Sequence, residues 1–367
     1  MTILSNMPFQ SGMGSTNRQR LARAAERAGC DVDFVETIGW RAAPPRFQKM
    51  ERVDVRHLWN IAPRAARPTA VAARRVNAGL SVRSSSALRG ALDEADLIVS
   101  FDPLEVLTRS VSHASRRVIY YCVDAYEFQP HIAGSGESHF TRIESEYVER
   151  SAAAVCTSTV LCEYKAALWG SDRPAYIPGS FEPVVSRADA IAHWSRRPRR
   201  DIPTALILAA LDRYKTDARE IGEIARANPN WRFHVYGRAT DPIGDISQEL
   251  RAVPNVEVRD AVNVEYLIRE APAYAVGLVC MTESDYSRHS FPLKIWDYMS
   301  LGLPVAAVNA PSLVGVPEVT ALVATDLSEF EQSPSDEALA SRMIDRAYGS
   351  TADHQWSAIT RVAGAYV

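Results

Sequence analysis

Residues 290–305 read SFPLKIWDYMSLGLPV, and this stretch predicts a short helix between two loops, followed by a buried strand. We expect Ser290 to cap the start of the helix and Pro292 to occupy its first turn, where a missing N–H costs nothing. Gly302 suits the left-handed residue that follows a last helical turn, and Pro304 prevents the helix from continuing. The run Pro-Val-Ala-Ala-Val at 304–308 has the composition of a buried strand.

Two polar residues of this helix, Lys294 and Asp297, lie three positions apart and therefore on one face. Both lie near a helix start, where free N–H groups and partial positive charge attract anions. In that setting a lysine suits a phosphate, and a carboxylate one turn later suits the hydroxyls of a sugar. The alternative is a surface ion pair on an amphipathic helix, and the pattern by itself leaves both interpretations open.

The composition indicates a globular protein of two domains. The chain has 367 residues, of which 47% are apolar, and its net charge of −3 gives no sign of a nucleic-acid partner. Its five cysteines are odd in number and form no CxxC pair, which indicates reduced thiols in a cytosolic protein and disfavours a disulfide scaffold or a zinc site. We expect no signal peptide, because no charged segment followed by an apolar core opens the sequence, and the longest apolar runs are too short to span a bilayer.

The first 35 residues indicate a parallel α/β domain. Residues 2–6 predict a strand, 7–15 a loop, 16–28 a helix and 31–35 a second strand. The loop contains Gly12 and Gly14 but lacks the third glycine of a dinucleotide fingerprint, which disfavours an NAD site and a dehydrogenase. The glycines favour a tight turn that lets the backbone approach a ligand or the other domain.

Residues 41–89 are strongly basic, with aromatic and aliphatic side chains between the cations. Three interpretations stay open: a surface that binds anionic lipid headgroups, a surface that binds nucleic acid, and a solvated helical face. The basic residues of this region are Arg41, Arg46, Lys49, Arg52, Arg56, Arg64, Arg67, Arg74, Arg75, Arg83 and Arg89.

Acidic residues end two predicted strands of the first domain, at Asp102 and Asp124. Ligands of open α/β sheets bind at the carboxyl ends of strands, so both positions suit a catalytic carboxylate, although aspartate also caps turns and helices there. Asp124 is the better candidate, because a loop long enough to line a cleft follows it. His131 and His139 lie in or beside that loop, and histidine is a residue type that can exchange a proton near neutral pH.

A second α/β unit begins afresh at residue 204. Before it, an arginine- and proline-rich segment with little apolar content near its end reads as a connection between domains. The expected organisation is an N-terminal domain at 1–186, a linker at 187–203, a second domain at 204–345 and a C-terminal helix at 346–367.

Four segments of the second domain resemble GT-B glycosyltransferases of the broad group related to the GT4 enzymes. Residues 292–305 resemble the signature P-x-K-x-x-E-Y-M-A-x-G-x-P-V, which is the most specific of the four. Residues 208–212 with Lys215 resemble the strand and basic loop at the donor diphosphate, 233–237 the strand ending in glycine beside the nucleotide, and 256–267 the strand and helix near the base. The first domain is more loosely similar, through the Y-x-x-x-D segment at 120–124, to bacterial polysaccharide glycosyltransferases such as the xanthan glucuronosyltransferase.

The resemblance implies an α/β fold with two Rossmann-like domains that face a cleft, the GT-B architecture, with the C-terminal helix packing back toward the N-terminal domain. It also implies a nucleotide-sugar donor in the second domain, with Lys294 at the phosphates and Asp297, in place of the family's glutamate, at the ribose. No metal ion or other cofactor is expected. The implied donor-binding residues are Arg213, Lys215, Tyr236, Gly237, His289, Ser290, Pro292, Lys294 and Asp297.

The base that deprotonates the acceptor in an inverting reaction would come from the first domain, and the resemblance implies Asp124. Its alternatives are His139, Glu127 and Asp102. Many GT4 enzymes carry a second glutamate eight positions before the acidic residue of the signature, whereas this sequence has His289 there. Closure of the two domains would exclude water and limit hydrolysis of the donor.

We therefore expect a glycosyltransferase that moves a hexosyl or uronosyl group from a nucleotide-sugar, with UDP as the favoured nucleotide, to a lipid-linked or glycan acceptor. The expected setting is cell-surface polysaccharide or glycolipid synthesis in the cytoplasm, with peripheral contact between the basic 41–89 region and an anionic membrane and no nucleic-acid partner. Two other functions fit the same architecture: a nucleotide-sugar 2-epimerase and a non-catalytic sugar-binding protein.

Overall fold

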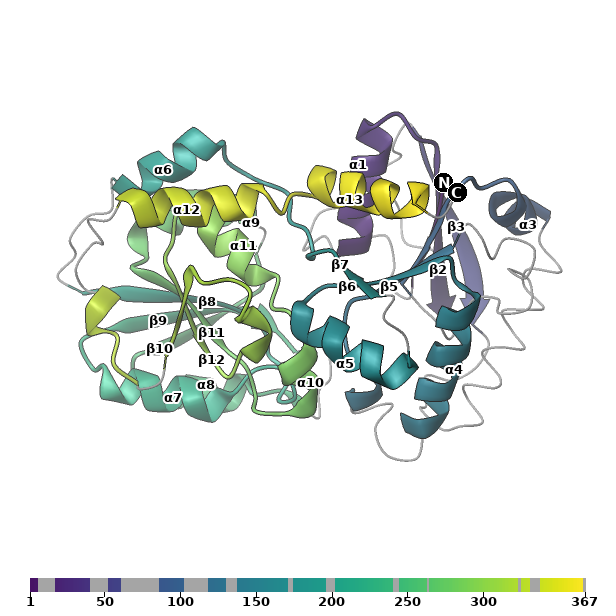
Figure 1. The fold of residues 1–367 in the computed structure, drawn as a ribbon. Coiled ribbons are helices and arrows are strands. Elements are labelled where there is room, and N and C mark those ends of the chain that lie inside the picture. The colour runs from purple at the N-terminus through teal and green to yellow at the C-terminus, as the bar shows by residue number, and fades with distance from the viewer. Residues whose placement is uncertain are drawn as a thin grey trace. The chain divides into compact units, whose positions relative to one another are not determined.

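A computed structural model gives the fold of the chain. It describes residues 1–5, 17–39, 52–60, 86–101, 118–129, 137–170, 174–195, 202–239, 244–262, 264–322, 325–330 and 337–365. The chain divides into two compact units (Figure 1). Unit 1 consists of Met1–Gly179 with Ala352–Val367, and unit 2 consists of Ser180–Thr351.

Unit 1 contains a parallel sheet with the strand order β3-β2-β1-β4-β5-β6-β7 among the described residues. The order reverses between β1 and β4, which is the topological switch of an open α/β sheet. The strands are β1 (Thr2–Ser5), β2 (Val32–Gly39), β3 (Val53–Asn60), β4 (Ile98–Ser100), β5 (Val118–Cys122), β6 (Ala153–Cys156) and β7 (Pro174–Tyr176).

Helices cover both faces of this sheet, which is why its central strands are buried throughout and mostly apolar. Leu21 and Ile359 pack on one face, and Tyr147 and Leu161 pack on the other. The helices of unit 1 are α1 (Asn17–Arg27), α3 (Ser86–Asp93), α4 (Glu137–Arg150), α5 (Thr159–Trp169) and α13 (Ala352–Gly364), with the short 3₁₀ turn η3 (Tyr126–Phe128).

The last helix of the chain, α13, belongs to unit 1 and lies against α1 (Figure 1). Ile359 is fully buried in the core there. The Gln355 side-chain amide donates to Asn17 Oδ1 (2.9 Å) and to the Tyr121 hydroxyl (2.6 Å). The predicted return of the C-terminal helix to the N-terminal domain is therefore confirmed.

Unit 2 contains a second parallel sheet, ordered β10-β9-β8-β11-β12-β13 among the described residues, with its switch between β8 and β11. Its strands are β8 (Thr204–Ala210), β9 (Arg232–Arg238), β10 (Val256–Arg259), β11 (Val276–Cys280), β12 (Val305–Val308) and β13 (Val319–Ala321). Its helices are α6 (Arg187–Ser195), α7 (Ala218–Ala227), α8 (Ser247–Arg251), α9 (Val264–Glu270), α10 (Asp285–His289), α11 (Lys294–Ser300) and α12 (Glu337–Tyr348), and its 3₁₀ turns are η5 (Ala271–Ala273), η6 (Pro311–Leu313) and η7 (Ser328–Phe330).

The segment predicted as a linker, 187–203, begins with a helix. This helix, α6, is part of unit 2, where Ala190 and Trp194 are buried. Its Arg187 pairs with Asp345 of α12 at 2.5 Å. The composition of the segment suggested a connection because only a few apolar residues, among them Ala190 and Trp194, fix this helix.

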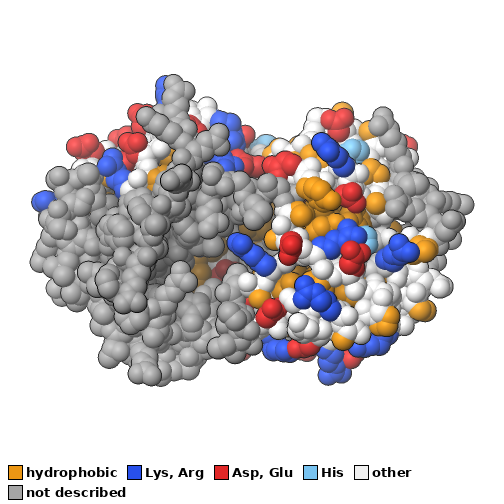
Figure 2. All heavy atoms as spheres, turned by 180° about the vertical axis from the view of Figure 1, so that it is seen from behind, with side chains coloured by type: hydrophobic (Ala, Val, Ile, Leu, Met, Phe, Trp, Pro, Cys, Tyr) orange, Lys and Arg blue, Asp and Glu red, His pale blue; other side chains and the backbone are white. Residues whose placement is uncertain are grey.

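Most of the basic 41–89 region lies outside the described residues. Its residues 53–60 form strand β3, so the interpretation as a helical face is wrong for that part. Two of its arginines serve local structure: Arg52 Nη1 donates to the Gly29 carbonyl (2.7 Å), and Arg56 pairs with Asp33 (2.5 Å). On the face shown in Figure 2, the described acidic, basic and apolar side chains are interspersed.

Candidate functional site

Two loops meet where the strand order of unit 2 reverses. Residues 212–216 follow β8, and residues 281–284 follow its neighbour β11. Thr282 joins them, because its N–H donates to the Lys215 carbonyl (3.3 Å) and its hydroxyl to the Arg213 carbonyl (2.6 Å). Open α/β sheets bind their ligands at such a switch point, outside the carboxyl ends of the strands.

Helix α10 precedes the signature stretch and α11 lies within it, and a loop separates the two helices. Ser284 caps α10 by accepting a hydrogen bond from Ser287 N (3.1 Å), and α11 begins only at Lys294 without a side-chain cap. The prediction that Ser290 caps the helix is therefore wrong, because the loop separates Ser290 from α11. Its carbonyl instead accepts from the Ser312 hydroxyl (2.7 Å). Pro292 lies in this loop, where its carbonyl accepts from Ile295 N (3.1 Å).

Tyr298 fixes α11 against the sheet. Its hydroxyl accepts a hydrogen bond from Leu208 N–H of β8 (2.6 Å) and donates to the Leu278 carbonyl of β11 (3.4 Å). Gly277 makes room for the ring, because a Cβ at that position would lie 2.4 Å from it. The tyrosine of the signature thus ties α11 to both strands of the switch.

Gly302 ends this helix with a φ of +71°, as the sequence predicts. A Cβ there would also lie 2.5 Å from the Ala190 carbonyl of α6. The glycine is required both by its left-handed backbone and by the close approach of the neighbouring helix.

Lys294 and Lys215 supply the positive charge of this site. Lys294 is half-buried, and burial lowers the pKa of its ammonium to about 8; Lys215 acts in the same direction, while Cys280 and Asp297 oppose it. The Lys215 ammonium lies 3.9 Å from the buried Asp212 carboxylate. Within the described residues, no hydrogen bond or ion pair engages the Lys294 ammonium, so the pair of lysines favours an anion.

Asp297 and His289 flank Lys294 in the chain. Asp297 is half-buried in α11, where its charge interacts with that of Lys294. His289 is largely buried, and its Nδ1 lies 2.8 Å from the Asp285 carbonyl. Because a carbonyl only accepts, Nδ1 is the donor of this hydrogen bond.

Arg213, which was also expected at the donor, is directed elsewhere. Its guanidinium pairs with Glu249 of α8, with an Nη1–Oε2 distance of 3.3 Å, and the side chain is 60% exposed. The structure thus brings Lys215, Lys294 and Asp297 together but engages Arg213 in a surface ion pair.

Tyr236 and Gly237 of β9 have structural roles in this arrangement. A Cβ at Gly237 would lie 2.0 Å from the Ala209 carbonyl of β8, so the glycine is needed for strand packing. Tyr236 is buried, and its hydroxyl accepts from Arg259 Nη1 (2.5 Å) and lies 3.2 Å from the Tyr274 hydroxyl.

A polar cluster around Arg259 was missed by the sequence analysis. Glu257 and Arg259 of β10 stand opposite His234 and Tyr236 of β9, so alternate positions of two neighbouring strands form it. Burial lowers the pKa of His234, and Arg259 adds to this effect. The signal in the sequence is the polar alternation in both strands, but only the register shows that the residues meet.

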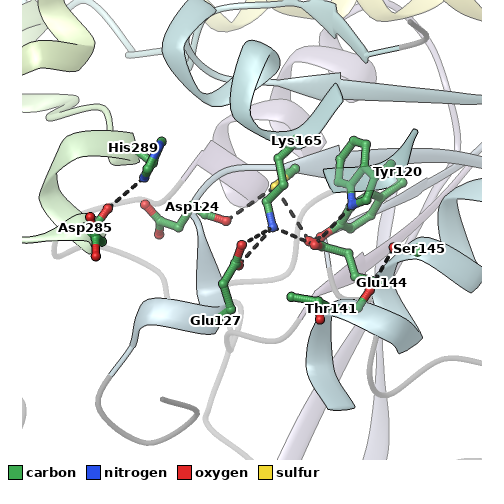
Figure 3. A network of polar contacts seen from close by, with 11 residues as sticks. Tyr120, Asp124, Glu127, Thr141, Glu144, Ser145, Lys165, Asp285 and His289 are labelled. Carbon is green, nitrogen blue, oxygen red and sulfur yellow. Dashed lines mark hydrogen bonds and ion pairs between the residues drawn. The ribbon is translucent and has the colours of Figure 1, made fainter. Parts of the chain in front are cut away.

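Asp124 of unit 1 lies two residues beyond β5 and is half-buried. Its carbonyl accepts from Tyr126 N (3.0 Å) and from Cys122 Sγ (3.3 Å). Of the alternatives for the base, Asp102 and the side chain of His139 lie outside the described residues. Glu127 is fully buried, and both of its carboxylate oxygens lie 2.9 Å from Lys165 Nζ (Figure 3), so it has no access to an acceptor.

Most of unit 2 matches a known family of proteins. Residues 205–342 match the family model described as glycosyl transferases group 1. Unit 2 contains a group 1 glycosyltransferase domain. Over 100 residues, the chain is also 33% identical to the Bacillus subtilis (strain 168) protein "Putative teichuronic acid biosynthesis glycosyltransferase TuaH", a match that spans 27% of this chain and 25% of that protein.

Solved structures share the fold of both units. Sucrose-phosphate synthase of Thermosynechococcus elongatus has a TM-score of 0.71 at 17% identity, over 100% of this chain and 99% of that chain. Alr3699/HepE of Anabaena, solved with UDP and glucose, has a TM-score of 0.67 at 14% identity, over 99% and 98%. The chain has the GT-B fold with two Rossmann-like units, which confirms the predicted fold class.

The described part of the chain has no helix with the length and apolar character needed to traverse a bilayer. It contains no group of three or more His, Cys, Asp or Glu side chains suited to a metal ion.

Proposed function

We propose that the glycosyltransferase domain binds a nucleotide-sugar and that the protein transfers its sugar to an acceptor hydroxyl. The observation that carries this proposal is the pair Lys215 and Lys294 at the topological switch of unit 2. Burial depresses the pKa of Lys294, so an anionic neighbour such as a diphosphate would stabilise its ammonium. HepE was solved with UDP and glucose, which favours a UDP-sugar as the donor.

In the proposed reaction the bond between the anomeric carbon and the diphosphate breaks, and its electrons leave with the diphosphate. The ammonium groups of Lys294 and Lys215 stabilise the growing negative charge. The acceptor oxygen bonds to the anomeric carbon and gives its proton to Asp124, a step that contributes roughly 10² to 10⁴ in rate. Asp297 accepts hydrogen bonds from the ribose, and His289 Nε2 accepts one from the sugar. No step uses a metal ion.

The proposed acceptor is a glycan or a lipid-linked saccharide of cell-surface polymer synthesis. The cytoplasm is the proposed location, with the basic 41–89 region contacting anionic lipid. Co-sedimentation with vesicles that contain anionic phospholipid tests this contact. Binding should weaken as salt rises, since exposed charges are screened beyond about 10 Å at 0.1 M salt; binding that salt does not affect would contradict the role of the arginines.

The donor site is tested by calorimetry and thermal melting with UDP, GDP, ADP and NAD. A nucleoside diphosphate at 100 times its Kd should stabilise the protein by about 2.7 kcal/mol. Stabilisation by UDP and transfer from a UDP-sugar in the presence of EDTA are the expected results. No response to any diphosphate would overturn the proposal, and a 2-epimer formed without transfer would select an epimerase.

A further inference from the structure

Unit 1 contains an enclosed ionic network that the proposed reaction does not use (Figure 3). Its charged members, Glu127 of η3, Glu144 of α4 and Lys165 of α5, are each fully buried. Lys165 Nζ lies 2.9 Å from both oxygens of Glu127 and 2.5 Å from Oε2 of Glu144. One ammonium thus uses all three of its N–H donors to join three separate elements.

Neutral side chains complete the network. Glu144 Oε1 accepts from the Tyr120 hydroxyl (2.7 Å), and Oε2 accepts from Trp169 Nε1 (3.2 Å). The aromatic rings of Phe140, Tyr164 and Trp169 lie 5.7–6.0 Å from the Lys165 ammonium. The enclosed Lys165 ammonium therefore keeps one set of hydrogen-bond partners in one geometry.

The charges of the network do not cancel, because two carboxylates face one ammonium. Burial raises the pKa of Glu144, while Lys165 opposes this effect. Burial by itself would lower the pKa of Lys165, yet Glu144, Cys122 and Glu127 raise it overall. Buried ion networks of this kind are a weak source of stability, since apolar residues of similar volume often do as well. A role in geometry accounts for it better.

The network holds the backbone of Asp124 from two sides. Glu127 is the central residue of η3, whose first N–H, that of Tyr126, donates to the Asp124 carbonyl (3.0 Å). Cys122 Sγ lies 3.3 Å from the same carbonyl and 3.8 Å from Glu144 Oε1. Anchoring Glu127 and Glu144 on one ammonium therefore fixes both groups that hold this peptide.

We propose that Glu127, Glu144 and Lys165 are positioning residues that hold Asp124 in place for proton transfer without touching the substrate. This inference rests on the proposed function, because it takes Asp124 as the base. Positioning matters at this point, since a displacement of about 1 Å can cost about 10²-fold in rate.

The test separates positioning from stability by comparing two variants. Lys165→Met leaves two uncompensated carboxylates and should lower Tm by about 10 °C. The triple variant Lys165→Met, Glu127→Gln and Glu144→Gln removes every charge and should regain most of that Tm. Its kcat should nevertheless stay at least about tenfold below wild type with an unchanged KM for the donor. A kcat that recovers together with Tm would show a merely structural network and overturn the proposal.

Hydrogen exchange gives a readout that does not depend on activity. In the triple variant and in Glu127→Gln, the amides of residues 126–129 should exchange faster, while those of β5 and β6 keep their protection. Unchanged exchange at 126–129 in both variants would overturn the proposal even where kcat falls. Glu146→Gln is the matched control, because it breaks an exposed pair with Arg142 on the same helix, α4. If the wild type transfers no sugar, the proposed function fails, whereas the exchange result still decides the network.

Discussion

Two lysines of this chain, Lys165 in unit 1 and Lys294 in unit 2, differ in the direction in which the fold shifts their pKa. Lys165 is fully buried, and carboxylates outweigh the effect of burial and raise its pKa. Lys294 is half-buried, and burial with a neighbouring ammonium lowers its pKa to about 8. An ammonium that the fold compensates is structural, and one that the fold leaves uncompensated suits an external anion.

The largest expected effect concerns Asp124, which the Lys165 network holds. Asp124→Asn should lower turnover by about 10²–10⁴-fold while UDP affinity stays the same, because the loss is confined to proton transfer. Steady-state kinetics and calorimetry measure the two quantities. The control is Asp96→Asn, an exposed aspartate that precedes a strand of the same sheet. Near-normal turnover in Asp124→Asn would place the base elsewhere.

Replacing each lysine by methionine should have opposite consequences: one variant should lose stability, and the other should lose UDP affinity. Lys165→Met should reduce the free energy of unfolding by about 3–5 kcal/mol, because it leaves buried carboxylates unpaired, and should leave UDP binding intact. Lys294→Met should weaken UDP binding by about 10–100-fold, as a charge-assisted hydrogen bond predicts, and should leave stability unchanged or raised. Denaturant unfolding and calorimetry test both halves. A Lys294→Met protein with a lower free energy of unfolding would contradict the distinction between a structural Lys165 and a ligand-binding Lys294.

The pH dependence of UDP binding sharpens the contrast further. Lys294 is protonated below its folded pKa of about 8, so its contribution to affinity is constant there. Above that pH, binding must first restore the proton, and affinity should fall by up to about tenfold per pH unit. In the unfolded state Lys294 keeps this proton up to its ordinary, higher pKa. Between the folded and the unfolded pKa, the free energy of unfolding therefore increases as the pH rises. Lys294→Arg, which stays charged, should show neither trend in calorimetry between pH 7 and 9.

The smallest expected effect concerns Arg213, which pairs with Glu249 and not with the groups around the two lysines. Arg213→Ala should change UDP affinity by less than about threefold, because its guanidinium is exposed and already paired with Glu249. The same titration applied to Lys215→Ala provides the comparison. A loss of more than tenfold in Arg213→Ala would return Arg213 to the donor site, as the sequence predicted.

The sequence predicted most of the order of elements in both units. Local rules suffice for Gly302, which needs a positive φ, and for the apolar strands of a doubly covered sheet. They failed at Ser290, because an earlier helix that Ser284 caps ends there and Ser290 is its C-terminal cap. They also could not give the role of Gly277, since its partner Tyr298 reaches it only through the fold.

The Lys165 network shows a different limit. Leu161, Lys165 and Trp169 lie four residues apart, so a lysine on an otherwise apolar helix face was visible in the sequence. The pattern indicates a buried pair but does not identify Glu127 and Glu144 as the partners. Both glutamates come from other elements. The sequence left Glu127 as a possible base, because only tertiary packing shows that it is buried.

The return of α13 to unit 1 has a consequence for biosynthesis. Unit 2 is continuous in the chain, at Ser180–Thr351, whereas unit 1 is made from two separated segments. A chain that emerges from the ribosome can close unit 2 before the residues that cover Leu21 and the Asn17 side chain exist, so the first domain to be translated is the last to be completed. Until Ala352–Gly364 arrive, one face of the first sheet lacks part of its cover and is open to chaperones and proteases.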